Sequence, residues 1–317
     1  MDNFKNFALI GAAGYIAPRH MQAIKETGNN LVCAIDKSDS VGILDRYFRN
    51  VDFFTEFERF DRHIEMKLLK NEPDRIQYVS ICSPNYLHDA HIRFALRVNA
   101  HAICEKPLVL NPWNLDALSA LEERSETKIY NILQLREHES IKNLREKLKH
   151  EKKDTKHSVV LTYVTTRGKW YDYSWKGSVE KSGGVATNIG IHFFDMLLWL
   201  FGDVQYQEVH ITEKRKIAGF LELEQANVTW YLSLDEHDLP ADVLQKGQNT
   251  YRSITIDNNE IEFSGGFSDL HTISYSNILL EKGFGIADAR ASIELVHKIR
   301  SSKIKDNSSL AKHPFLA

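Results

Sequence analysis

Short apolar runs alternate with longer amphipathic segments from residue 6 to about residue 132. The runs read NFALIG, LVCAID, DFFT, YVSICS, AICE and KIYNIL, and the segments between them cover 15–27, 40–49, 56–71, 86–99 and 111–126. Short strands that alternate with helices form a parallel sheet, because each crossover helix lies on a face of that sheet. The pattern predicts an α/β fold whose first domain is a doubly wound parallel sheet.

The pattern changes after a charged helix predicted at about 137–150. A strand-like run, HSVVLTYVTT, and a helix at about 188–201 come first, followed by VQYQEVHIT, GFLELEQANVTWYLSL, YRSITID, NEIEFSG and DLHTISYSN. These later runs alternate apolar and polar residues with period two, which indicates strands with one buried face. We expect an α+β domain with a large open, mostly antiparallel sheet and helices on one side.

The 317 residues are enough for two domains, which we place at 1–132 and 133–317. The second domain ends with a helix at about 286–300. The last segment, SSKIKDNSSLAKHPFLA, is polar enough to predict a loosely held tail.

Charge and composition argue against several classes of partner. Lys and Arg number 40 and Asp and Glu number 43, so the formal net charge is −3, which gives no reason to expect nucleic acid or an anionic membrane. The most apolar helical run, FFDMLLWLF, falls far short of the roughly 20 residues of a membrane span. No targeting segment is apparent and no C-x-x-C pair occurs, so we expect a cytoplasmic protein without a bound metal.

A glycine-rich turn, GAAGYIA, follows the first predicted strand and opens the first helix. Gly11 permits the tight turn, Gly14 lets a pyrophosphate approach the backbone, and Ala17 replaces the third glycine of a dinucleotide fingerprint. Asp36 ends the second strand, where a carboxylate binds ribose hydroxyls and repels a 2′-phosphate, so NAD is favoured over NADP. The turn predicts cofactor contacts from Gly11, Ala12, Gly14, Tyr15, Ile16 and Asp36.

A second polar motif, SPN, follows the fourth predicted strand. Ligands of doubly wound sheets bind at the carboxyl ends of strands near the switch point, so Ser83 and Asn85 are predicted to flank the nicotinamide half of the cofactor. His88 comes shortly after. It is assigned to the cofactor site, with a helix-capping or core histidine as the alternative.

AICEKP ends the fifth predicted strand, and the same rule directs Glu105 and Lys106 towards the cofactor. An ammonium group beside a nicotinamide can hold a substrate hydroxyl and relay its proton, so Lys106 is a candidate catalytic residue. Glu105 is assigned to the cofactor site, where it would pair with Lys106 or contact the nicotinamide ribose. The alternative is a structural ion pair.

The second domain carries GGVATNIGIHFFD. On a helix Asn188, His192, Asp195 and Trp199 share one face, because they are spaced i, i+4, i+7 and i+11. Polar residues on an otherwise apolar helix need partners, so this face either lines a site or caps neighbouring strands. The preceding glycines allow close backbone approach, which favours the site.

These motifs resemble the Gfo/Idh/MocA oxidoreductases, whose GxxGxxA turn, SPN, EKP and G-x-H-x-x-D occur here in the same order from residue 6 to about 300. The resemblance implies Lys106 and His192 as the catalytic pair, and a second domain whose open sheet oligomerises, with a tetramer favoured. Asn188 stands where many members carry aspartate, so it is expected to bind substrate.

Within the family, ALIGAAGYIAPRHMQAIKETGN resembles the branch that oxidises the C3 hydroxyl of UDP-N-acetylglucosaminuronic acid (UDP-GlcNAcA) to a ketone in surface polysaccharide (O-antigen) biosynthesis. The resemblance implies a UDP-sugar substrate, with 2-oxoglutarate as a possible co-oxidant. The run from Arg167 to Lys176 mixes basic and aromatic residues, which suits a diphosphate, a carboxylate and a stacked ring, although an oligomer edge has a similar composition. The predicted substrate contacts are Gln134, Arg167, Trp175, Lys176, Asn188 and His192.

The predicted reaction transfers hydride to NAD while His192 or Lys106 accepts the hydroxyl proton and the other residue orients the oxygen. A neutral imidazole suits this role near pH 7, which favours His192 as the base. The alternatives are a dehydrogenase of a free polyol or aldose, and a non-catalytic NAD-sensing regulator on the same fold. A regulator could dispense with both residues, which are present.

Overall fold

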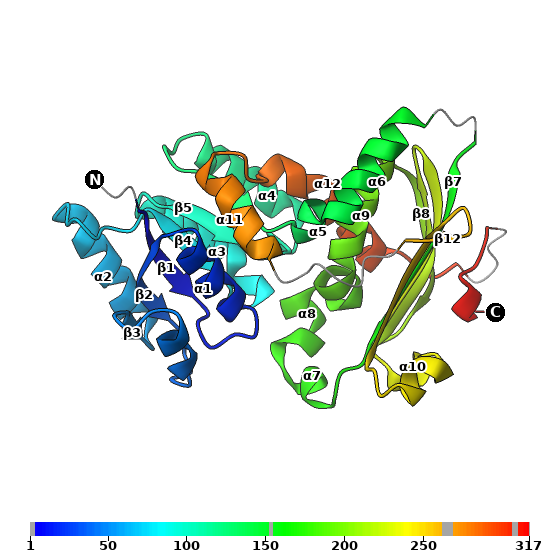
Figure 1. Ribbon diagram of the computed structural model, residues 1–317, viewed down its shortest axis with the longest axis horizontal. Coiled ribbons are helices and arrows are strands. Elements are labelled where there is room, and N and C mark those ends of the chain that lie inside the picture. Colours follow the sequence, from blue (N-terminus) through cyan, green and yellow to red (C-terminus); the bar gives the residue numbers. More distant parts are fainter. Residues whose placement is uncertain (1–3, 152–154, 262–268, 306–309, 317) are drawn as a thin grey trace. The chain divides into compact units, whose positions relative to one another are not determined.

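The chain forms two compact units. The computed structural model describes residues 4–151, 155–261, 269–305 and 310–316 (Figure 1). The first unit comprises Met1–Glu137 and Ser268–Arg290, and the second comprises His138–Phe267 and Ala291–Ala317. A boundary at residue 132 would assign residues 268–290 to the second domain, whereas the chain returns with them to the first unit.

The first unit contains the predicted parallel sheet. Its strands lie in the order β3-β2-β1-β4-β5-β6, and each neighbouring pair is parallel. The chain order reverses between β1 and β4, which is the switch point of a doubly wound sheet. This confirms the predicted fold of the first domain. The strands are β1 (Asn6–Ile10), β2 (Asn30–Ile35), β3 (Asp52–Phe54), β4 (Tyr78–Ile81), β5 (His101–Cys104) and β6 (Ile129–Asn131).

Crossover handedness distributes the helices over the two faces of this sheet. Right-handed connections place α1 (Ala17–Glu26) on one face, and α2 (Phe57–Leu69), α3 (His88–Arg97) and α4 (Pro112–Glu122) on the other. The ring centroids of Phe57 in α2 and Phe94 in α3 lie 5.2 Å apart, as expected for two helices on the same face. The helix expected at 40–49 is a short 3-10 turn, η1 (Gly42–Arg46). The face that carries α1 is therefore left largely uncovered over β4, β5 and β6.

Helix α11 (Leu270–Leu279) covers that face and corrects a prediction. DLHTISYSN was predicted as a strand, but it forms this helix beside α1. Its buried residues recur at helical spacing, whereas Ile273, which a strand would bury with His271 and Tyr275, is exposed. Tyr275 stacks on Phe7 of β1 at 5.8 Å, and Ile278 joins the same apolar cluster as Tyr130 of β6. Burial against an open sheet face outweighed the local alternation.

The second unit contains the other sheet, in the order β12-β11-β7-β10-β9-β8. Strands β7 and β10 are parallel and the other pairs are antiparallel, which confirms the prediction of a mostly antiparallel sheet. GFLELEQANVTWYLSL forms the β9–β10 hairpin, and part of NEIEFSG lies outside the described residues. The strands are β7 (His157–Thr165), β8 (Val204–Thr212), β9 (Lys216–Leu223), β10 (Ala226–Ser233), β11 (Thr250–Ile256) and β12 (Asn259–Glu260).

Helices α6 (Glu139–His150) and α9 (Ile191–Phe201) pack together in this unit, where the Arg145 guanidinium lies 4.1 Å from the Trp199 ring centroid. Phe194 of α9 packs edge-on against the buried Trp230 of β10, so α9 covers one face of the mixed sheet. The remaining helices and turns are η2 (Asn85–Leu87), α5 (Gln134–Glu137), α7 (Trp170–Tyr173), η3 (Trp175–Gly177), α8 (Val179–Ser182), η4 (Ala186–Gly190), η5 (Glu236–Asp238), α10 (Ala241–Gln245), α12 (Ile286–Ser301) and η6 (Pro314–Leu316).

The described part of the C-terminal segment is held more firmly than its composition suggests. Ile304 pairs with Val209 at the edge strand β8. His313 is 1% exposed, its Nε2 lies 2.9 Å from the Thr162 hydroxyl, and its ring stacks on Tyr231. The prediction of a loosely held tail is wrong for these residues, because the sheet face opposite α9 offers them apolar partners.

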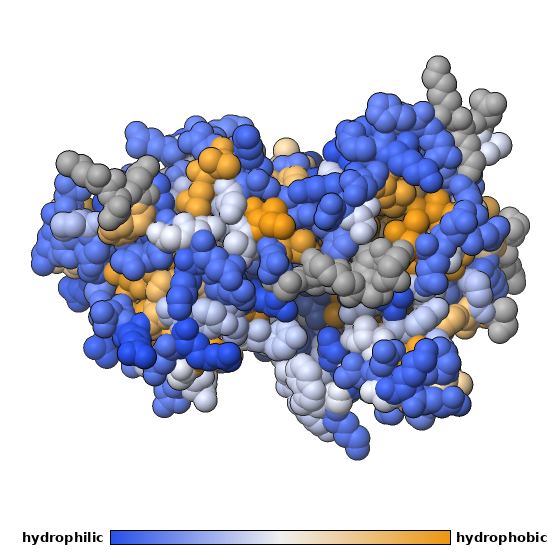
Figure 2. Space-filling view, in the orientation of Figure 1, coloured by the Kyte–Doolittle hydropathy of each residue, from blue (hydrophilic) through white to orange (hydrophobic). Residues whose placement is uncertain are grey.

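Hydrophilic residues cover most of the face shown in Figure 2, with smaller apolar areas between them. Apolar side chains instead fill the interiors of both units. In the described residues, one stretch, Val179–Phe201, is long and apolar enough to span a membrane by length and composition. Since 78% of its most apolar part is buried, it has the environment of a core helix.

Candidate active site

The glycine turn meets the end of β4 at the switch point of the first sheet. Gly11 has φ +90°, and a Cβ there would lie 2.8 Å from the carbonyl carbon and oxygen of Cys82 and 2.9 Å from the nitrogen of Ser83. A Cβ on Gly14 would lie 3.0 Å from the Gly11 oxygen. Only glycine fits position 11, because the main chain of the turn lies directly against the main chain of Cys82 and Ser83 before it enters α1. The structure brings the glycine turn and the SPN motif together, as their places in the sequence predict.

Asp36 is anchored to the same turn. Its Oδ2 accepts the Ala13 amide at 3.0 Å, and its Oδ1 accepts the Ser38 amide at 2.9 Å. Tyr15 is exposed at the turn, and the first turn of α1 carries neither an acidic residue nor a side-chain cap. A helix N-terminus without a competing anion suits a pyrophosphate. A carboxylate held beside it suits the adenosine ribose.

The residues after β4 are buried and tied to their neighbours. Ser83 Oγ lies 2.8 Å from His91 Nδ1, and Asn85 is buried in the turn η2. The fully buried His88 contacts two main-chain oxygens, that of Pro107 from Nδ1 at 2.7 Å and that of Ser83 from Nε2 at 2.9 Å. His88 thus joins the SPN loop to the EKP loop through its ring.

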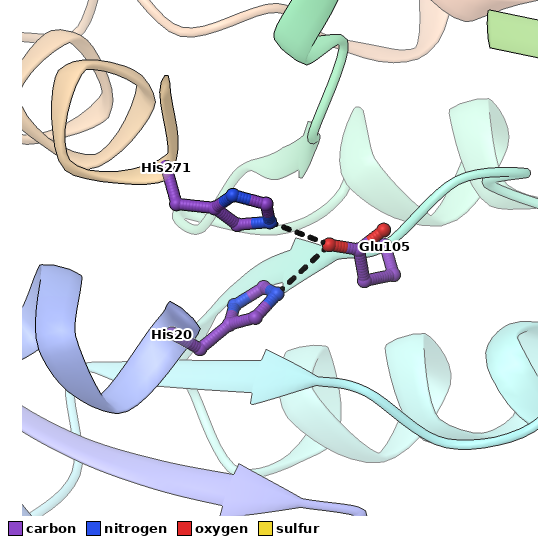
Figure 3. A group of neighbouring side chains, drawn as sticks. All are labelled: His20, Glu105 and His271. Carbon is purple, nitrogen blue, oxygen red and sulfur yellow. Dashed lines mark hydrogen bonds and ion pairs between the residues drawn. The ribbon is translucent and has the colours of Figure 1, made fainter. Parts of the chain in front are cut away.

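Glu105 faces the interior of the first unit. Its Oε1 accepts from His20 Nε2 at 3.0 Å and from His271 Nε2 at 2.9 Å (Figure 3). Its Oε2 accepts the Lys106 amide at 3.2 Å. Burial opposes ionisation of this carboxyl, but the hydrogen bonds from the two histidines outweigh it and hold its pKa well below the usual range. Glu105 is therefore a buried carboxylate.

Proton positions in this cluster follow from its hydrogen bonds. Burial lowers the pKa of His20, so the ring is neutral near pH 7. Because Nε2 donates to Glu105, Nδ1 carries a lone pair and accepts from the Tyr275 hydroxyl at 2.7 Å. The Tyr275 oxygen in turn accepts from Ser80 Oγ at 2.6 Å. The chain of donors runs from β4 through α11 and α1 to the end of β5.

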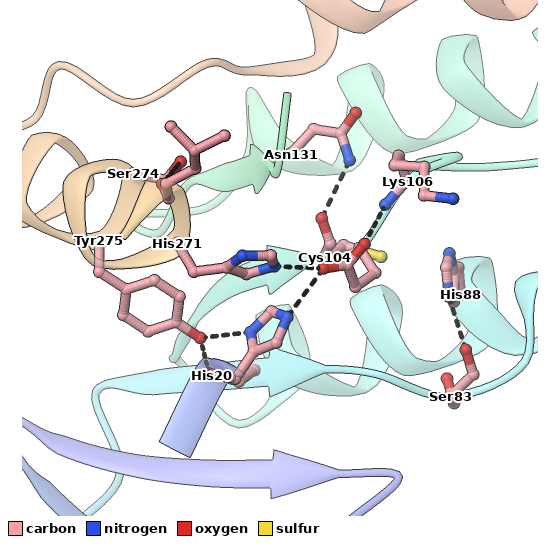
Figure 4. A network of polar contacts seen from close by, with 12 residues as sticks. His20, Ser83, His88, Cys104, Lys106, Asn131, His271, Ser274 and Tyr275 are labelled. Atoms are coloured by element: carbon pink, nitrogen blue, oxygen red, sulfur yellow. Dashed lines mark hydrogen bonds and ion pairs between the residues drawn. The ribbon is translucent and has the colours of Figure 1, made fainter. Parts of the chain in front are cut away.

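Lys106 is half-buried, and in Figure 4 its side chain extends away from the two histidines, on the side of His88. Contacts fix the main chain on both sides of it. The Cys104 oxygen accepts from Asn131 Nδ2 at 2.9 Å, and the Pro107 oxygen contacts His88. The peptide bond between Lys106 and Pro107 is cis. The loop that carries the amine is held at each of its four residues, 104 to 107.

His20, Glu105 and His271 also have the composition of a metal site. Their ligand atoms lie within 4.8 Å of one another, and this is the one such group found in the described residues. Both ring nitrogens approach the same carboxylate oxygen at hydrogen-bond distance, and His20 is completed by Tyr275 on its other side. Hydrogen bonds donated by the two imidazole rings therefore explain the short distances within this group.

The second unit holds the other candidate catalytic residue. His192 lies in the first turn of α9 and is half-buried, while Asp195 is buried further along the helix. Asn188 lies in the wider turn η4, where its Nδ2 donates to the Tyr171 hydroxyl at 2.9 Å. The helix predicted over 188–201 therefore begins with a π turn, a feature often found at functional sites.

The basic and aromatic run after β7 forms the short turns α7 and η3. Lys176 Nζ lies 5.5 Å from the Trp170 ring centroid and 5.7 Å from that of Trp175. Burial, aided by the positive charge of Arg167, lowers the pKa of Lys176. Arg167 Nη1 donates to the Thr165 hydroxyl at 2.9 Å. The run concentrates cations and aromatic rings at the end of a strand, as its sequence indicates.

Gln134 opens the short helix α5 in the first unit and is half-buried. The neighbouring Arg136 is buried, donates to the Asp288 main-chain oxygen at 2.9 Å, and stacks on Phe284 at 5.2 Å. Arg136 thus ties α5 to the returning segment of the first unit.

Sequence reasoning missed His20, His271, Tyr275 and Ser80. His20 lies in α1 but outside the glycine fingerprint, and the other two rings belong to a segment predicted as a strand. The signal was indirect. Because the segment 40–49 forms only a short turn, the first 132 residues supply too few helices to cover both faces of their sheet, and another segment has to return to it.

Two family models match the chain. The model described as "Oxidoreductase family, NAD-binding Rossmann fold" matches residues 5–132, and "Oxidoreductase family, C-terminal alpha/beta domain" matches residues 156–256. The chain belongs to the Gfo/Idh/MocA oxidoreductase family. Its first unit is the NAD-binding Rossmann domain of that family, and its cofactor is NAD.

Several solved structures are similar to this chain over nearly its whole length. The WlbA (WbpB) dehydrogenase of Thermus thermophilus in complex with NAD and alpha-ketoglutarate is 47% identical, with TM-score 0.94, and covers 98% of this chain and 100% of that one. The same enzyme in complex with NAD and UDP-GlcNAcA gives TM-score 0.93 at the same identity and coverage. WlbA of Bordetella pertussis, at 18% identity and TM-score 0.76 over 95% of this chain and 96% of that one, shares the fold.

The curated relatives are more distant in sequence. Glucose-6-phosphate 3-dehydrogenase of Bacillus subtilis is 23% identical over 62% of this chain, and myo-inositol 2-dehydrogenase of Thermotoga maritima is 24% identical over 42% of it. The matches span 54% and 38% of those relatives' own lengths.

The residues of the Rossmann domain fit NAD. The glycine turn has no room for a Cβ at Gly11, the helix behind it lacks a competing anion, and the Asp36 carboxylate suits an unphosphorylated ribose. Bound there, NAD supplies a hydride acceptor at its nicotinamide. The chain's own contribution to the chemistry is to bind, to orient and to move the hydroxyl proton.

Proposed function

We propose that this protein oxidises the C3 hydroxyl of UDP-GlcNAcA to the 3-keto sugar with NAD, in the biosynthesis of a surface polysaccharide. The observation that carries the proposal is the 47% identity over 98% of this chain to an enzyme whose solved structure contains NAD and UDP-GlcNAcA. The alignment covers both units, so the similarity includes the proposed substrate domain as well as the NAD-binding domain. The motifs of both halves are present.

In the proposed reaction, the hydroxyl proton leaves to a side chain as hydride leaves C3. His192 is the proposed base, because a neutral imidazole accepts a proton near pH 7. Lys106 is proposed to orient the oxygen and to stabilise the negative charge that develops on it. The two residues exchange roles if the pKa of the ammonium is lowered when substrate is bound.

The proposed substrate contacts come from several segments. Arg167 and Lys176 would bind the diphosphate or the uronic carboxylate, and Trp175 would stack on a ring. Gln134 and Asn188 would donate hydrogen bonds to sugar oxygens. The Asn188 amide already donates to Tyr171, which orients it.

The cofactor contacts are proposed at the glycine turn and at the SPN motif. Gly11, Ala12, Gly14, Tyr15 and Ile16 would surround the pyrophosphate, and Ser83, Asn85 and His88 would shape the nicotinamide side. 2-Oxoglutarate is the proposed co-oxidant that reoxidises NADH, since the solved enzyme of T. thermophilus binds it as alpha-ketoglutarate. We also propose a cytoplasmic homotetramer.

The test is NADH formation from NAD with UDP-GlcNAcA, measured by absorbance beside UDP-N-acetylglucosamine, glucose 6-phosphate and myo-inositol at equal concentration. Mass spectrometry of small molecules released from the purified protein identifies any nucleotide that remains bound. We expect reduction of NAD with UDP-GlcNAcA above all other sugars. If glucose 6-phosphate or myo-inositol is preferred, the protein is a dehydrogenase of simpler sugars, and if no sugar reduces bound NAD, the NAD-sensing regulator is favoured.

A further inference from the structure

The cluster around Glu105 does more than fill the core. His20 comes from α1, His271 and Tyr275 come from α11, and Ser80 comes from β4, yet all connect to the residue beside Lys106 (Figure 4). A buried carboxylate costs several kcal/mol in desolvation even after relaxation, and two apolar side chains of similar volume would fill the space without that cost. Because this costly carboxylate lies one residue from a candidate catalytic amine, we expect it to have an effect on that amine.

The hydrogen bonds of this cluster form one connected chain that ends at Glu105. Ser80 donates to Tyr275, Tyr275 donates to His20, and His20 donates to Glu105. His271 donates to the same Glu105 oxygen, which leaves the other oxygen for the Lys106 amide at 3.2 Å. A carboxylate held in this way has one orientation, because either rotation or protonation would break hydrogen bonds from the buried rings.

We propose that His20 and His271 are positioning residues, which hold the Glu105 carboxylate so that it fixes the main chain of Lys106 and hence the place of its amine beside the cofactor. The proposal rests on the proposed function in that Lys106 is the group positioned. Asn131 and His88 hold the residues on either side, so the histidines supply the middle part of a clamp over four consecutive residues.

The same cluster couples the cofactor turn to Lys106. His20 lies one turn into α1, the helix whose N-terminus suits the pyrophosphate, and its Nε2 reaches Glu105 directly. Helix α11 completes the cluster because His271 and Tyr275 are four residues apart and therefore share one face. The returning segment of the first unit thus supplies His271, which contacts Glu105 directly, and Tyr275, which contacts it through His20.

The main test replaces His271 in the full-length protein. His271→Leu removes the donor and roughly keeps the volume, whereas His271→Gln places an amide nitrogen near the position of Nε2. Ser274→Ala is the matched control, because Ser274 is buried in the same helix and its hydroxyl donates to the Leu270 oxygen within that helix. Steady-state kinetics are measured from pH 5 to 9.

We expect His271→Leu to lower kcat by about tenfold to a hundredfold, since small misplacement of a reacting group has effects of this size. KM for NAD and for the sugar should change by less than about threefold, and His271→Gln should recover most of kcat. The acid limb of the pH profile should move to higher pH in His271→Leu, because Glu105 loses a donor that stabilises its ionised form. Equal losses in His271→Leu and Ser274→Ala would overturn the proposal, and so would an unchanged kcat in His271→Leu.

Two further measurements do not depend on the substrate. The rate at which acetic anhydride acetylates Lys106, read by mass spectrometry, should change several-fold in His271→Leu and stay unchanged in Ser274→Ala. If the wild type oxidises none of the sugars, the proposed function fails while this labelling still decides the positioning role. Stoichiometric zinc or iron that is retained by the wild type and lost in His271→Leu would also overturn the proposal, since a cation would then hold the three residues.

Tyr275→Phe provides a second variant should His271→Leu fold poorly. It keeps the ring that stacks on Phe7 and removes the hydroxyl that fixes the His20 tautomer. We expect a smaller decrease in kcat, of about threefold to tenfold, with the acid limb shifted in the same direction. A Tyr275→Phe protein with the wild-type profile and the wild-type labelling rate of Lys106 would contradict the proposed positioning role.

Discussion

The two units hold their candidate catalytic residues in different ways. In the first unit Lys106 lies in a loop held at four consecutive residues by buried side chains from α1, α3, α11 and β6. In the second unit His192 lies in the first turn of helix α9, and the basic run occupies the short turns α7 and η3, with half-buried cations near aromatic rings. A rigid cofactor half suits a ligand common to the whole family. The short turns of the second unit, where we propose that substrate binds, are a place where members of a family can differ in their ligand.

The strongest test of this contrast removes the two candidate catalytic groups separately. Lys106→Met and His192→Gln should each lower kcat by about 10² to 10⁴, the usual range for loss of a proton-transfer group. NAD affinity should fall by less than about threefold in both, which is checked by calorimetric titration. Lys25→Met, at an exposed position of α1, is the control. Wild-type turnover in either variant would remove that residue from the mechanism.

The next test concerns the glycine turn. Gly11→Ala forces a Cβ to within 2.8 Å of the Cys82 main chain at a positive φ, so we expect a loss of about 3 kcal/mol in stability and of most NAD binding. Gly28→Ala is the matched control, because Gly28 also has a positive φ (+74°) but its Cβ would meet nothing within 4 Å. It should cost about 1 kcal/mol and leave NAD affinity unchanged. Equal behaviour of the two variants would mean that close approach to β4 does not matter.

A third test asks whether the second unit also has rigid buried polar groups away from its turns. Burial lowers the pKa of His313 to about 4 from an ordinary value of 6.5. The unfolded chain therefore binds the proton more readily, so the stabilising effect is complete above pH 6.5 and is lost as the pH falls towards 4.

Between pH 7 and pH 5 this histidine should account for about 2 kcal/mol of lost stability. His313→Gln should remove that part of the pH dependence in chemical unfolding of the second unit, followed by Trp fluorescence. His237→Gln, at an exposed position, is the control. If both variants keep the wild-type pH dependence, the C-terminal segment is not packed as described.

The smallest expected effect lies in the proposed substrate site of the second unit. Lys176→Ala should raise KM for UDP-GlcNAcA about tenfold, equivalent to about 1.4 kcal/mol, because one cation is lost from the proposed site of a charged sugar nucleotide. KM for NAD should stay the same. Lys181→Ala, at an exposed position nearby, is the control, and an equal effect of both variants would point to general surface charge.

The sequence predicted the Rossmann sheet, its switch point and the mixed second sheet, because short-range periodicity decides which strands are buried on one face or on both. It also placed the glycine turn next to the SPN motif. It could not reveal the cluster at Glu105, since His20 and His271 are far apart in the chain and each looks like an ordinary core residue. The returning helix α11 was missed because a nine-residue run with mixed spacing fits both periods, and only the uncovered sheet face selects the helix.

The central claim is that hydride passes from C3 of UDP-GlcNAcA to NAD on this protein. The most direct test incubates the purified protein and NAD with UDP-GlcNAcA that carries deuterium at C3, followed by mass spectrometry of the reduced cofactor and of the sugar nucleotide. We predict NADH that carries one deuterium and a 3-keto sugar that has lost it. Unlabelled NADH, or no NADH while the unlabelled control substrates are oxidised, would contradict the account.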